Sequence, residues 1–155
     1  MIDHELESKG LRLVDEHINR VQKYLADVIG QLALRSANHD RSKLSPEELG
    51  LVLGKPAFDK YEYMSKEERA ALEAVKESLV HHYANNRHHP EHYEDGIYGM
   101  GLLSLLIMAV DWKAAGEMSA NGSYQQSIEF NTERFGLTPE LVKVLENTGR
   151  ELGWL

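Results

Sequence analysis

A histidine and an aspartate follow one another in the segment 38–43, which reads Asn-His-Asp-Arg-Ser-Lys. Adjacent imidazole and carboxylate groups, here His39 and Asp40, can bind one divalent ion together or position a water beside it. Further residues of the same kind lie elsewhere in the chain: His17, Asp111 and, between residues 81 and 92, His81, His82, His88, His89 and His92. The pattern predicts that several of these residues form one site.

The absence of cysteine limits the chemistry of such a site. Disulfides and thiolate ligands are excluded, so a transition metal must be held by histidine, aspartate, glutamate and water. These ligands suit manganese, iron, cobalt, nickel, magnesium and zinc. We therefore expect one or two divalent ions, and two ions can clamp both the attacking and the leaving oxygen of a phosphoryl group.

Net charge and hydropathy exclude some partners. The chain has 155 residues and a formal net charge of -8, from 25 acidic and 17 basic side chains. Extended nucleic-acid binding needs a basic surface and is not expected, whereas a nucleotide remains a suitable substrate because a metal supplies positive charge. The longest apolar run, 101–110, is too short to span a bilayer, and the polar N-terminus is no signal peptide. We expect a cytoplasmic protein with no membrane segment.

The elements that must position these residues are helical. Residues 7–35 carry an apolar stripe at steps of three and four residues, which predicts a long helix with one inner face. The stripe consists of Val14, Ile18, Val21, Leu25, Val28 and Leu32. His17 falls on this face or at its border, where the alternative to a ligand is a hydrogen-bonded core histidine. Polar residues end the helix near 36–38, so His39 and Asp40 lie at its end.

A short helix is expected after this end. The residues Ser-Pro-Glu-Glu at 45–48 combine an N-cap serine, a proline at the first helical position and acids in the first turn. We expect this helix to end near Leu53 and residues 54–63 to form a surface loop.

The next expected helix carries a histidine into the core. It begins with a capping box at 65–68 and ends near Tyr83. His82 is in phase with the apolar residues of this helix, whereas His81 is turned about 100° away. The segment 85–96 that follows is either a solvated polar loop or, because it is rich in histidine, part of a metal site or a cluster of proton carriers.

Residues 102–115 are apolar nearly all round and predict a central buried helix. Asp111 lies within it, pointing inward, with Trp112 and Lys113 at the rim. A buried carboxylate is costly unless it is paired or bound to a metal, which makes Asp111 a candidate ligand. The alternatives are an ion pair with Lys113 or Arg87, or simple exposure at the end of the core.

Two further helices, 123–135 and 138–152, complete the chain, and Thr138 is expected to cap the second of them. No stretch shows the period-two alternation of a strand. The sequence therefore predicts one all-α domain over residues 1–155, a bundle of about six helices.

The order of His17, the His39-Asp40 pair and Asp111 resembles the HD-domain superfamily of metal-dependent phosphohydrolases. That superfamily has an all-helical fold and a scattered pattern of a histidine, a His-Asp pair, optional further histidines and a late aspartate. The run that begins at His39 is similar to its His-Asp-x-Gly-Lys segment, with Ser42 in place of the glycine.

A closer similarity, over roughly residues 10–150, is to a family of small bacterial and phage proteins without an established function. They combine a His-Asp-x-Ser-Lys segment with a His-His-x5-His-His-Pro-Glu-His segment and an Asp-Trp pair near the end of an apolar helix. The segment 81–92 and the pair Asp111-Trp112 match this pattern.

The resemblance to the HD superfamily implies an enzyme that hydrolyses a phosphate ester of a nucleotide or similar small molecule with a metal-activated water. It implies His17, His39, Asp40 and Asp111 as ligands of the main metal, with Asp40 as a catalytic bridge. We further expect His82, His88 or His89 to hold a second metal or to donate to the phosphate, and a neutral histidine near the leaving oxygen, with His88 as the catalytic candidate, to act as general acid. Lys43 and Arg87 would contact a substrate phosphate, and Glu91 would orient an imidazole.

Two alternatives remain open. One is a di-iron oxygenase on an HD-type scaffold, and the other is a non-catalytic protein that binds a metal or a nucleotide. The expected partner is a small phosphate-bearing molecule, and a homodimer is a further candidate assembly. Three tyrosines, Tyr61, Tyr63 and Tyr124, fit either a pocket or a dimer surface.

Overall fold

The computed structural model describes residues 4–58, 61, 65–119 and 121–155. These residues form seven α-helices and four short 3-10 helices and contain no strand, which confirms the all-α class. The chain divides into two compact units, residues 1–39 and residues 40–155. The single domain over 1–155 stays a prediction. Among the described helices, none combines the length and apolar character that a membrane-spanning helix needs.

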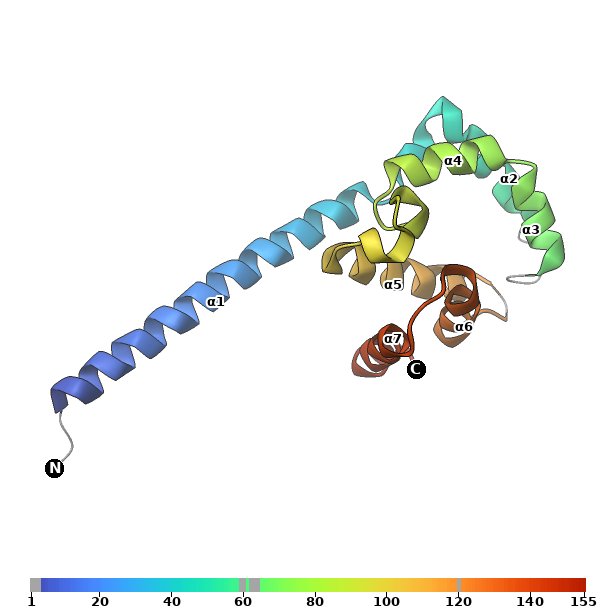
Figure 1. The fold of residues 1–155 in the computed structure, drawn as a ribbon. Coiled ribbons are helices and arrows are strands. Elements are labelled where there is room, and N and C mark those ends of the chain that lie inside the picture. The colour runs from blue at the N-terminus through green and yellow to red at the C-terminus, as the bar shows by residue number, and fades with distance from the viewer. Residues whose placement is uncertain (1–3, 59–60, 62–64, 120) are drawn as a thin grey trace. The chain divides into compact units, whose positions relative to one another are not determined.

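The first unit is one unbroken helix, α1, which spans His4–Asn38 (Figure 1). It extends the expected helix by three residues at each end. Taken by itself, α1 buries none of its residues, and Val14 on the expected inner stripe is 54% exposed. Periodicity specifies an amphipathic helix, but a lone helix has no partner on which to bury its apolar face. The expectation of a buried stripe is therefore not met within this unit.

The second unit begins with three helical segments: η1 (Arg41–Leu44), η2 (Pro46–Glu48) and α2 (Leu49–Phe58). The helix start at 45–48 is confirmed, with Pro46 in the first helical position. The loop predicted from residue 54 is wrong as far as Phe58, because α2 continues to that residue. The rest of that predicted loop, except Tyr61, lies outside the described residues, and so does Tyr63.

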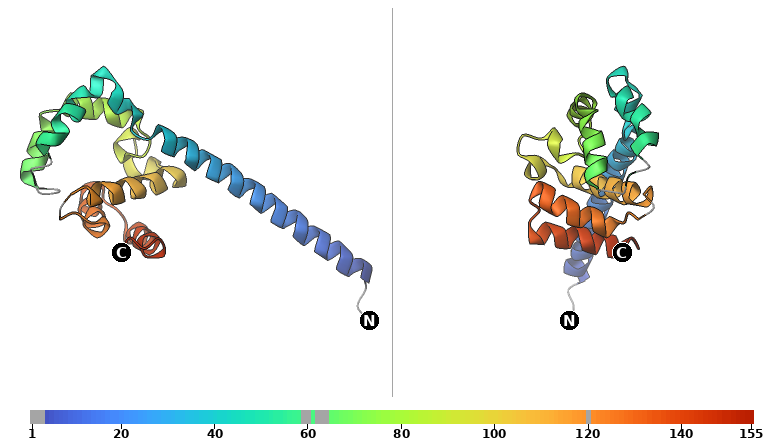
Figure 2. Two further views of the ribbon diagram at one scale, coloured as in Figure 1. Left: turned by 180° about the vertical axis from the view of Figure 1, so that it is seen from behind. Right: turned by 90° about the vertical axis from the view of Figure 1, so that its right-hand side faces the viewer.

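The helix predicted between 65 and 83 is divided into α3 (Lys66–Glu73) and α4 (Lys76–Asn85). A tertiary contact accounts for the break. Val75 and Ser78 lie against Gly50 of α2, where an added Cβ would come within 3.1 Å of the Ser78 Oγ. Ser78 also donates to the carbonyl of Glu47 at 2.8 Å. The helix is thus interrupted so that α4 can lie beside α2 (Figure 2).

The histidine-rich segment after α4 contains two 3-10 helices, η3 (Pro90–His92) and η4 (Gly96–Gly99). Gly99 is required here for a close approach, because a Cβ at this position would lie 2.8 Å from the Cβ of Tyr93. The Tyr93 hydroxyl donates to the carbonyl of Arg87 at 3.0 Å and lies within hydrogen-bond distance of the Ser104 hydroxyl, at 3.1 Å, which can donate to it. The segment is therefore folded back on itself and onto the next helix, and the solvated-loop alternative does not describe it.

The apolar core is built by α5 (Leu102–Glu117), α6 (Tyr124–Phe135) and α7 (Pro139–Glu151). α6 packs against both α5 and α7. The most deeply buried apolar side chains of this core, each 1% exposed, are Met108, Ala109, Tyr124 and Ile128. Ser123 and Thr138 cap α6 and α7, where their hydroxyls accept from the backbone N–H groups of Gln126 and Leu141. The predicted cap at Thr138 is confirmed.

Three expectations about this core need correction. Trp112, expected at the rim, is only 7% exposed and packs in the core, where it stacks with Phe135. The helix α5 is not buried all round, since Leu102 is 77% exposed and Val110 is 46% exposed. Tyr124 fills the core and is not on a surface. Composition alone does not say which side of an apolar helix has neighbours to pack against.

Candidate metal centre

Four side chains of the second unit bring ligand atoms to one place. Asp40, His82, His88 and His89 each offer one atom, and these atoms lie within 4.8 Å of one another. Asp40 directly precedes η1, His82 lies on α4, and His88 and His89 lie between α4 and η3. Residues as far apart in the chain as Asp40 and His89 thus bring potential ligand atoms together.

The separations between these atoms fit the edges of a metal coordination shell. The Nε2 atoms of His82 and His89 are 3.0 Å apart. The Asp40 Oδ1 lies 3.4 Å from the Nε2 of His82 and 3.4 Å from that of His88. Donors about 2.1 Å from a metal lie roughly 3.0 Å apart at 90° and roughly 3.4 Å apart at the tetrahedral angle. The four donors could therefore hold one metal ion.

A buried carboxylate orients the histidines from behind. Glu48 on η2 is 0% exposed, and its two oxygens accept from the Nδ1 atoms of His81 and His82, each at 2.8 Å. Because Nδ1 of His82 carries the donated hydrogen, its Nε2 presents a lone pair toward Asp40 and His89. Histidine ligands of metals commonly donate their other ring nitrogen to a carboxylate in this way.

Two neutral side chains complete this support. The Asn86 amide donates to the Ser42 hydroxyl at 2.6 Å and to the carbonyl of His82 at 2.8 Å. Asn86 is only 6% exposed. It ties η1 to the last turn of α4, so the backbone that carries Asp40 and the backbone that carries His82 are held together.

The two carboxylate oxygens of Asp40 have different neighbours. Oδ1 faces His82 and His88, whereas Oδ2 accepts from the ammonium group of Lys43. The backbone of Asp40 is left-handed, with φ of 56°, a conformation that aspartate tolerates better than most residues. In the described part of the chain it is the one residue other than glycine with positive φ. Such conformations are often found at functional sites.

The electrostatic environment keeps the ring nitrogens available as ligands. Burial lowers the pKa of His89 to about 3, helped by repulsion from His88 and His82 and opposed by Asp111 and Asp40. Burial also lowers the pKa of His82, against the effect of its hydrogen bond with Glu48. Burial acts to raise the pKa of Glu48, but its hydrogen bonds with His81, Ser42 and His82 outweigh this and lower it. Neutral imidazoles beside ionised carboxylates are the protonation states that a metal requires.

The remaining predicted residues are distributed as follows. Asp111 on α5 is half-buried and close enough to act on the charge of His89, while Lys113 pairs with Glu117 at 2.9 Å. Arg87 is exposed. His92 donates from Nδ1 to the carbonyl of Tyr83 at 3.0 Å.

Glu91 does not occupy the expected place beside an imidazole. It forms an ion pair with Arg134 of α6, and the carboxylate that orients imidazoles is Glu48 instead. His17 is exposed on α1 and His39 is the last residue of the first unit. The roles of His17 and His39 as ligands stay predictions.

Glu48 and Asn86 were missed by sequence reasoning. Glu48 stands in a Ser-Pro-Glu-Glu helix start, where Glu47 and Glu48 look equivalent and both suit a helix N-terminus. Only their environments distinguish them, since Glu47 is exposed and Glu48 is enclosed. Asn86 had a weak signal, because it lies four residues after His82 and so on the same side of the helix.

A family model described as a family of unknown function, DUF5662, matches residues 6–151, which covers most of both units. No curated protein and no solved structure matches the chain.

Proposed function

We propose that this chain, which belongs to DUF5662, a family of unknown function, is an HD-type metal-dependent phosphohydrolase. The proposal rests on the chain's candidate metal centre. The proposed substrate is a nucleotide or a similar small phosphate ester. The observation that carries the proposal is the group of Asp40, His82, His88 and His89, backed by the enclosed carboxylate of Glu48. A polar cluster that served only stability would not need four potential metal ligands with a buried carboxylate that orients one of their imidazoles.

The donor set also limits which metal ions the centre would bind. Three imidazoles and one carboxylate favour zinc, iron, nickel, cobalt or manganese over magnesium, which prefers oxygen ligands. We therefore propose a transition metal. His17, His39 and Asp111 are further proposed ligands, in line with the resemblance to the HD superfamily.

A bound divalent ion would supply a water of lowered pKa and polarise the phosphoryl group. In the reaction, the water gives up a proton, its oxygen bonds to phosphorus, the ester P–O bond breaks, and the leaving oxygen takes up a proton. Lys43, which is paired with Asp40 and 41% exposed, is the first proposed contact of a substrate phosphate. Arg87 is the second proposed phosphate contact. His88 is the proposed acid for the leaving oxygen in a centre in which Asp40, His82 and His89 hold the ion and His88 does not.

The test begins with elemental analysis of untagged protein purified without chelator. The wild type is compared with Asp40→Ala and with the matched control Asp27→Ala, which removes an exposed carboxylate of α1. The metal-loaded proteins are then assayed for phosphate release from nucleoside mono-, di- and triphosphates and from nitrophenyl phosphate esters. We expect metal and turnover in the wild type and in Asp27→Ala, and loss of both in Asp40→Ala.

Other outcomes would overturn the proposal. Wild-type protein that takes up none of these metals on soaking has no such centre. A loaded protein that turns over no phosphate ester is a binding protein. Loaded iron protein with an oxygen-dependent absorption band and no phosphate release would point to an oxygenase instead.

A further inference from the structure

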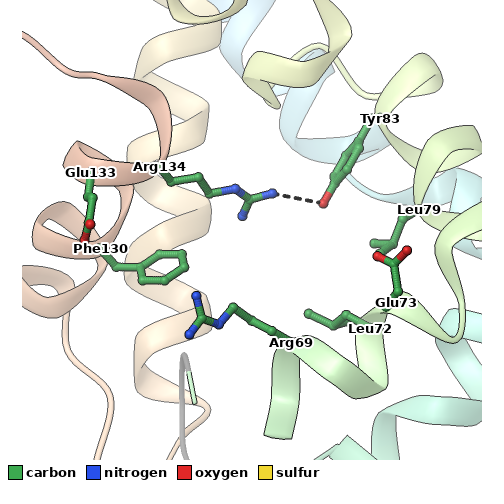
Figure 3. Close-up of a pocket in the computed structure, with 8 residues that line it drawn as sticks. All are labelled: Arg69, Leu72, Glu73, Leu79, Tyr83, Phe130, Glu133 and Arg134. Carbon is green, nitrogen blue, oxygen red and sulfur yellow. Dashed lines mark hydrogen bonds between the residues drawn. The ribbon is translucent and has the colours of Figure 1, made fainter. Parts of the chain in front are cut away.

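A pocket lies beside the metal centre. It has a volume of about 510 Å³ and is lined by side chains of α3, α4 and α6 (Figure 3). Pockets for small ligands and cofactors span about 300–1,000 Å³, so this one can hold a molecule of nucleotide size. No residue that lines it is one of the four metal-centre donors.

One part of the wall is apolar and flat. Phe130 of α6 presents its ring, and Leu72 and Leu79 lie on the opposite side, on α3 and α4 (Figure 3). Any of the nucleobases can stack on an aromatic ring, since every base has a π-face. The wall therefore suits a nucleobase.

The other part of the wall is charged and holds two arginines and two glutamates, of which Glu73 pairs with Lys76 at 2.7 Å. Arg69 of α3 and Arg134 of α6 both extend into the space in Figure 3. The Arg69 guanidinium lies 5.8 Å from the centroid of the Phe130 ring, within the range of a cation–π contact. Arginine presents five donors in a planar fork that matches the oxygens of a phosphate. The pocket thus places two phosphate-binding groups next to a stacking surface.

Arg134 is held in place by contacts that use one of its nitrogens. Its Nη2 donates to the carboxylate of Glu91 and, at 3.4 Å, to the hydroxyl of Tyr83. Among the described residues, the Arg134 side chain forms hydrogen bonds through Nη2 and none through Nη1 or Nε. The pair with Glu91 orients the fork, and the other edge is the one suited to a ligand. Glu133, also in the wall, suits the hydroxyl or amino donors that a nucleoside carries.

Tyr83 lies between this pocket and the metal centre. It lines the cavity, and its ring centroid lies 5.0 Å from that of His89 and 6.1 Å from that of His82. A molecule that fills the cavity is therefore separated from the ligand histidines by the thickness of one side chain.

We propose that this pocket binds the base and a phosphoryl group of the substrate other than the one that is hydrolysed. The substrate is then a nucleoside di- or triphosphate, with its base against Phe130 and its retained phosphate between Arg69 and Arg134. This assignment of the ligand as substrate rests on the proposed phosphohydrolase function. A single phosphate would occupy the metal centre and leave Arg69, and the edge of Arg134 that does not face Glu91, without a phosphate to bind.

The first experiment measures binding by calorimetry to the full chain as purified. The test ligands are non-hydrolysable methylene analogues of the four common nucleoside diphosphates, together with the monophosphates, the nucleosides and inorganic pyrophosphate. The variants are Arg69→Gln and the matched control Arg150→Gln, which removes an exposed arginine of α7. Michaelis constants for the diphosphates are measured in parallel, with the metal content of every variant.

We expect at least one diphosphate analogue to bind more tightly than its monophosphate and its nucleoside. Arg69→Gln should weaken that binding and raise KM by roughly tenfold or more, the usual effect of losing a charge-assisted hydrogen bond. Its metal content should not change, and Arg150→Gln should match the wild type. Arg134→Lys keeps a charge for Glu91 but loses the fork, so it should also weaken binding. Phe130→Leu should weaken nucleotide binding and leave pyrophosphate binding unchanged.

Equal affinities for diphosphate, monophosphate and nucleoside would overturn the proposal, and so would Arg69→Gln that binds like the wild type. The two proposals can fail separately. Turnover with an unchanged KM in Arg69→Gln keeps the phosphohydrolase and overturns the pocket. Binding that depends on Arg69, in a metal-loaded protein without turnover, supports the ligand class and overturns the phosphohydrolase.

Discussion

The second unit has two interiors that differ in composition. Around α5, α6 and α7 the enclosed side chains are mainly apolar, with Met108 and Ile128 each 1% exposed. Around η2, α4 and η3 they are ionisable or polar: Glu48 is 0% exposed, His82 3% and His88 6%. Both regions exclude water, yet only the first gains hydrophobic free energy from doing so.

The difference shows what each interior is for. Buried polar groups must be hydrogen-bonded, and a network that is not fully satisfied is less stable than apolar packing. The histidine region therefore contributes little net stability and needs support from outside it. The apolar region provides that support, because Trp112 and Met108 fix α5, which carries Asp111 toward the histidines. We infer a division within this unit, in which the apolar region provides stability and the histidine region provides the chemistry.

The largest expected effect is on the apolar side. Ile128→Ala should lower the free energy of unfolding by about 2–5 kcal/mol, because it removes a fully enclosed side chain and leaves a cavity. Denaturant unfolding followed by circular dichroism measures this loss. The metal content of the protein that remains folded should be unchanged. A folded Ile128→Ala protein without metal would contradict the division.

The next effect concerns the pH dependence of the apolar core. Burial raises the pKa of Tyr124 to about 12, while a tyrosine in the unfolded chain titrates near 10. Between these values the folded state binds more protons than the unfolded state, so stability falls as pH rises. The loss should approach roughly 2–3 kcal/mol by pH 12 and should be absent below pH 10. Urea unfolding across pH 8 to 12 tests this.

Tyr124→Phe is the control for that titration, since it keeps the ring and removes the ionisable hydroxyl. It also removes the hydroxyl's bond to the carbonyl of Leu145, at 3.3 Å, so its stability at neutral pH sets its own baseline. A decline above pH 10 that is as steep in Tyr124→Phe as in the wild type would rule out Tyr124 as its cause.

On the polar side, Glu48→Gln should weaken metal affinity by roughly 10- to 100-fold. The amide offers one acceptor and one donor where the carboxylate offered two acceptors to His81 and His82. One imidazole must then present a lone pair at Nδ1 and carry its proton at Nε2. If that imidazole is His82, its ligand atom is blocked. Competition with a chromogenic chelator measures the affinity.

Glu47→Gln is the matched control, since it makes the same change at the neighbouring exposed residue. It should leave metal affinity within about twofold of the wild type, the small effect usual for a surface substitution. Equal losses in Glu47→Gln and Glu48→Gln would mean that the effect is one of overall charge and not of orientation.

The smallest effect tests whether the apolar region tolerates a purely local defect. Thr138→Ala removes the hydroxyl that accepts from the backbone N–H of Leu141 at the start of α7. Loss of such a cap costs about 1 kcal/mol of stability. Thermal unfolding should show a correspondingly small drop, and Thr138→Ser should restore the wild-type value. An unchanged metal affinity is expected in both variants.

Local sequence determined the helices where a start signal and a periodic pattern coincide. α6 and α7 begin within one residue of the positions that Ser123 and Thr138 indicate, because a capping hydroxyl satisfies the N–H groups that a helix leaves open. The histidines between 81 and 92, with Asp40, were identified as a potential site from residue type alone, since imidazole and carboxylate are the metal ligands available without cysteine.

Tertiary structure decided which of these residues meet and which others join them. The burial of Glu48, the break at Val75 and the core position of Trp112 depend on contacts between segments far apart in the chain. Such contacts leave no local signature, because periodicity fixes the face of a helix but not the element it faces. For the same reason the sequence alone does not show that Arg69 and Arg134 line one cavity.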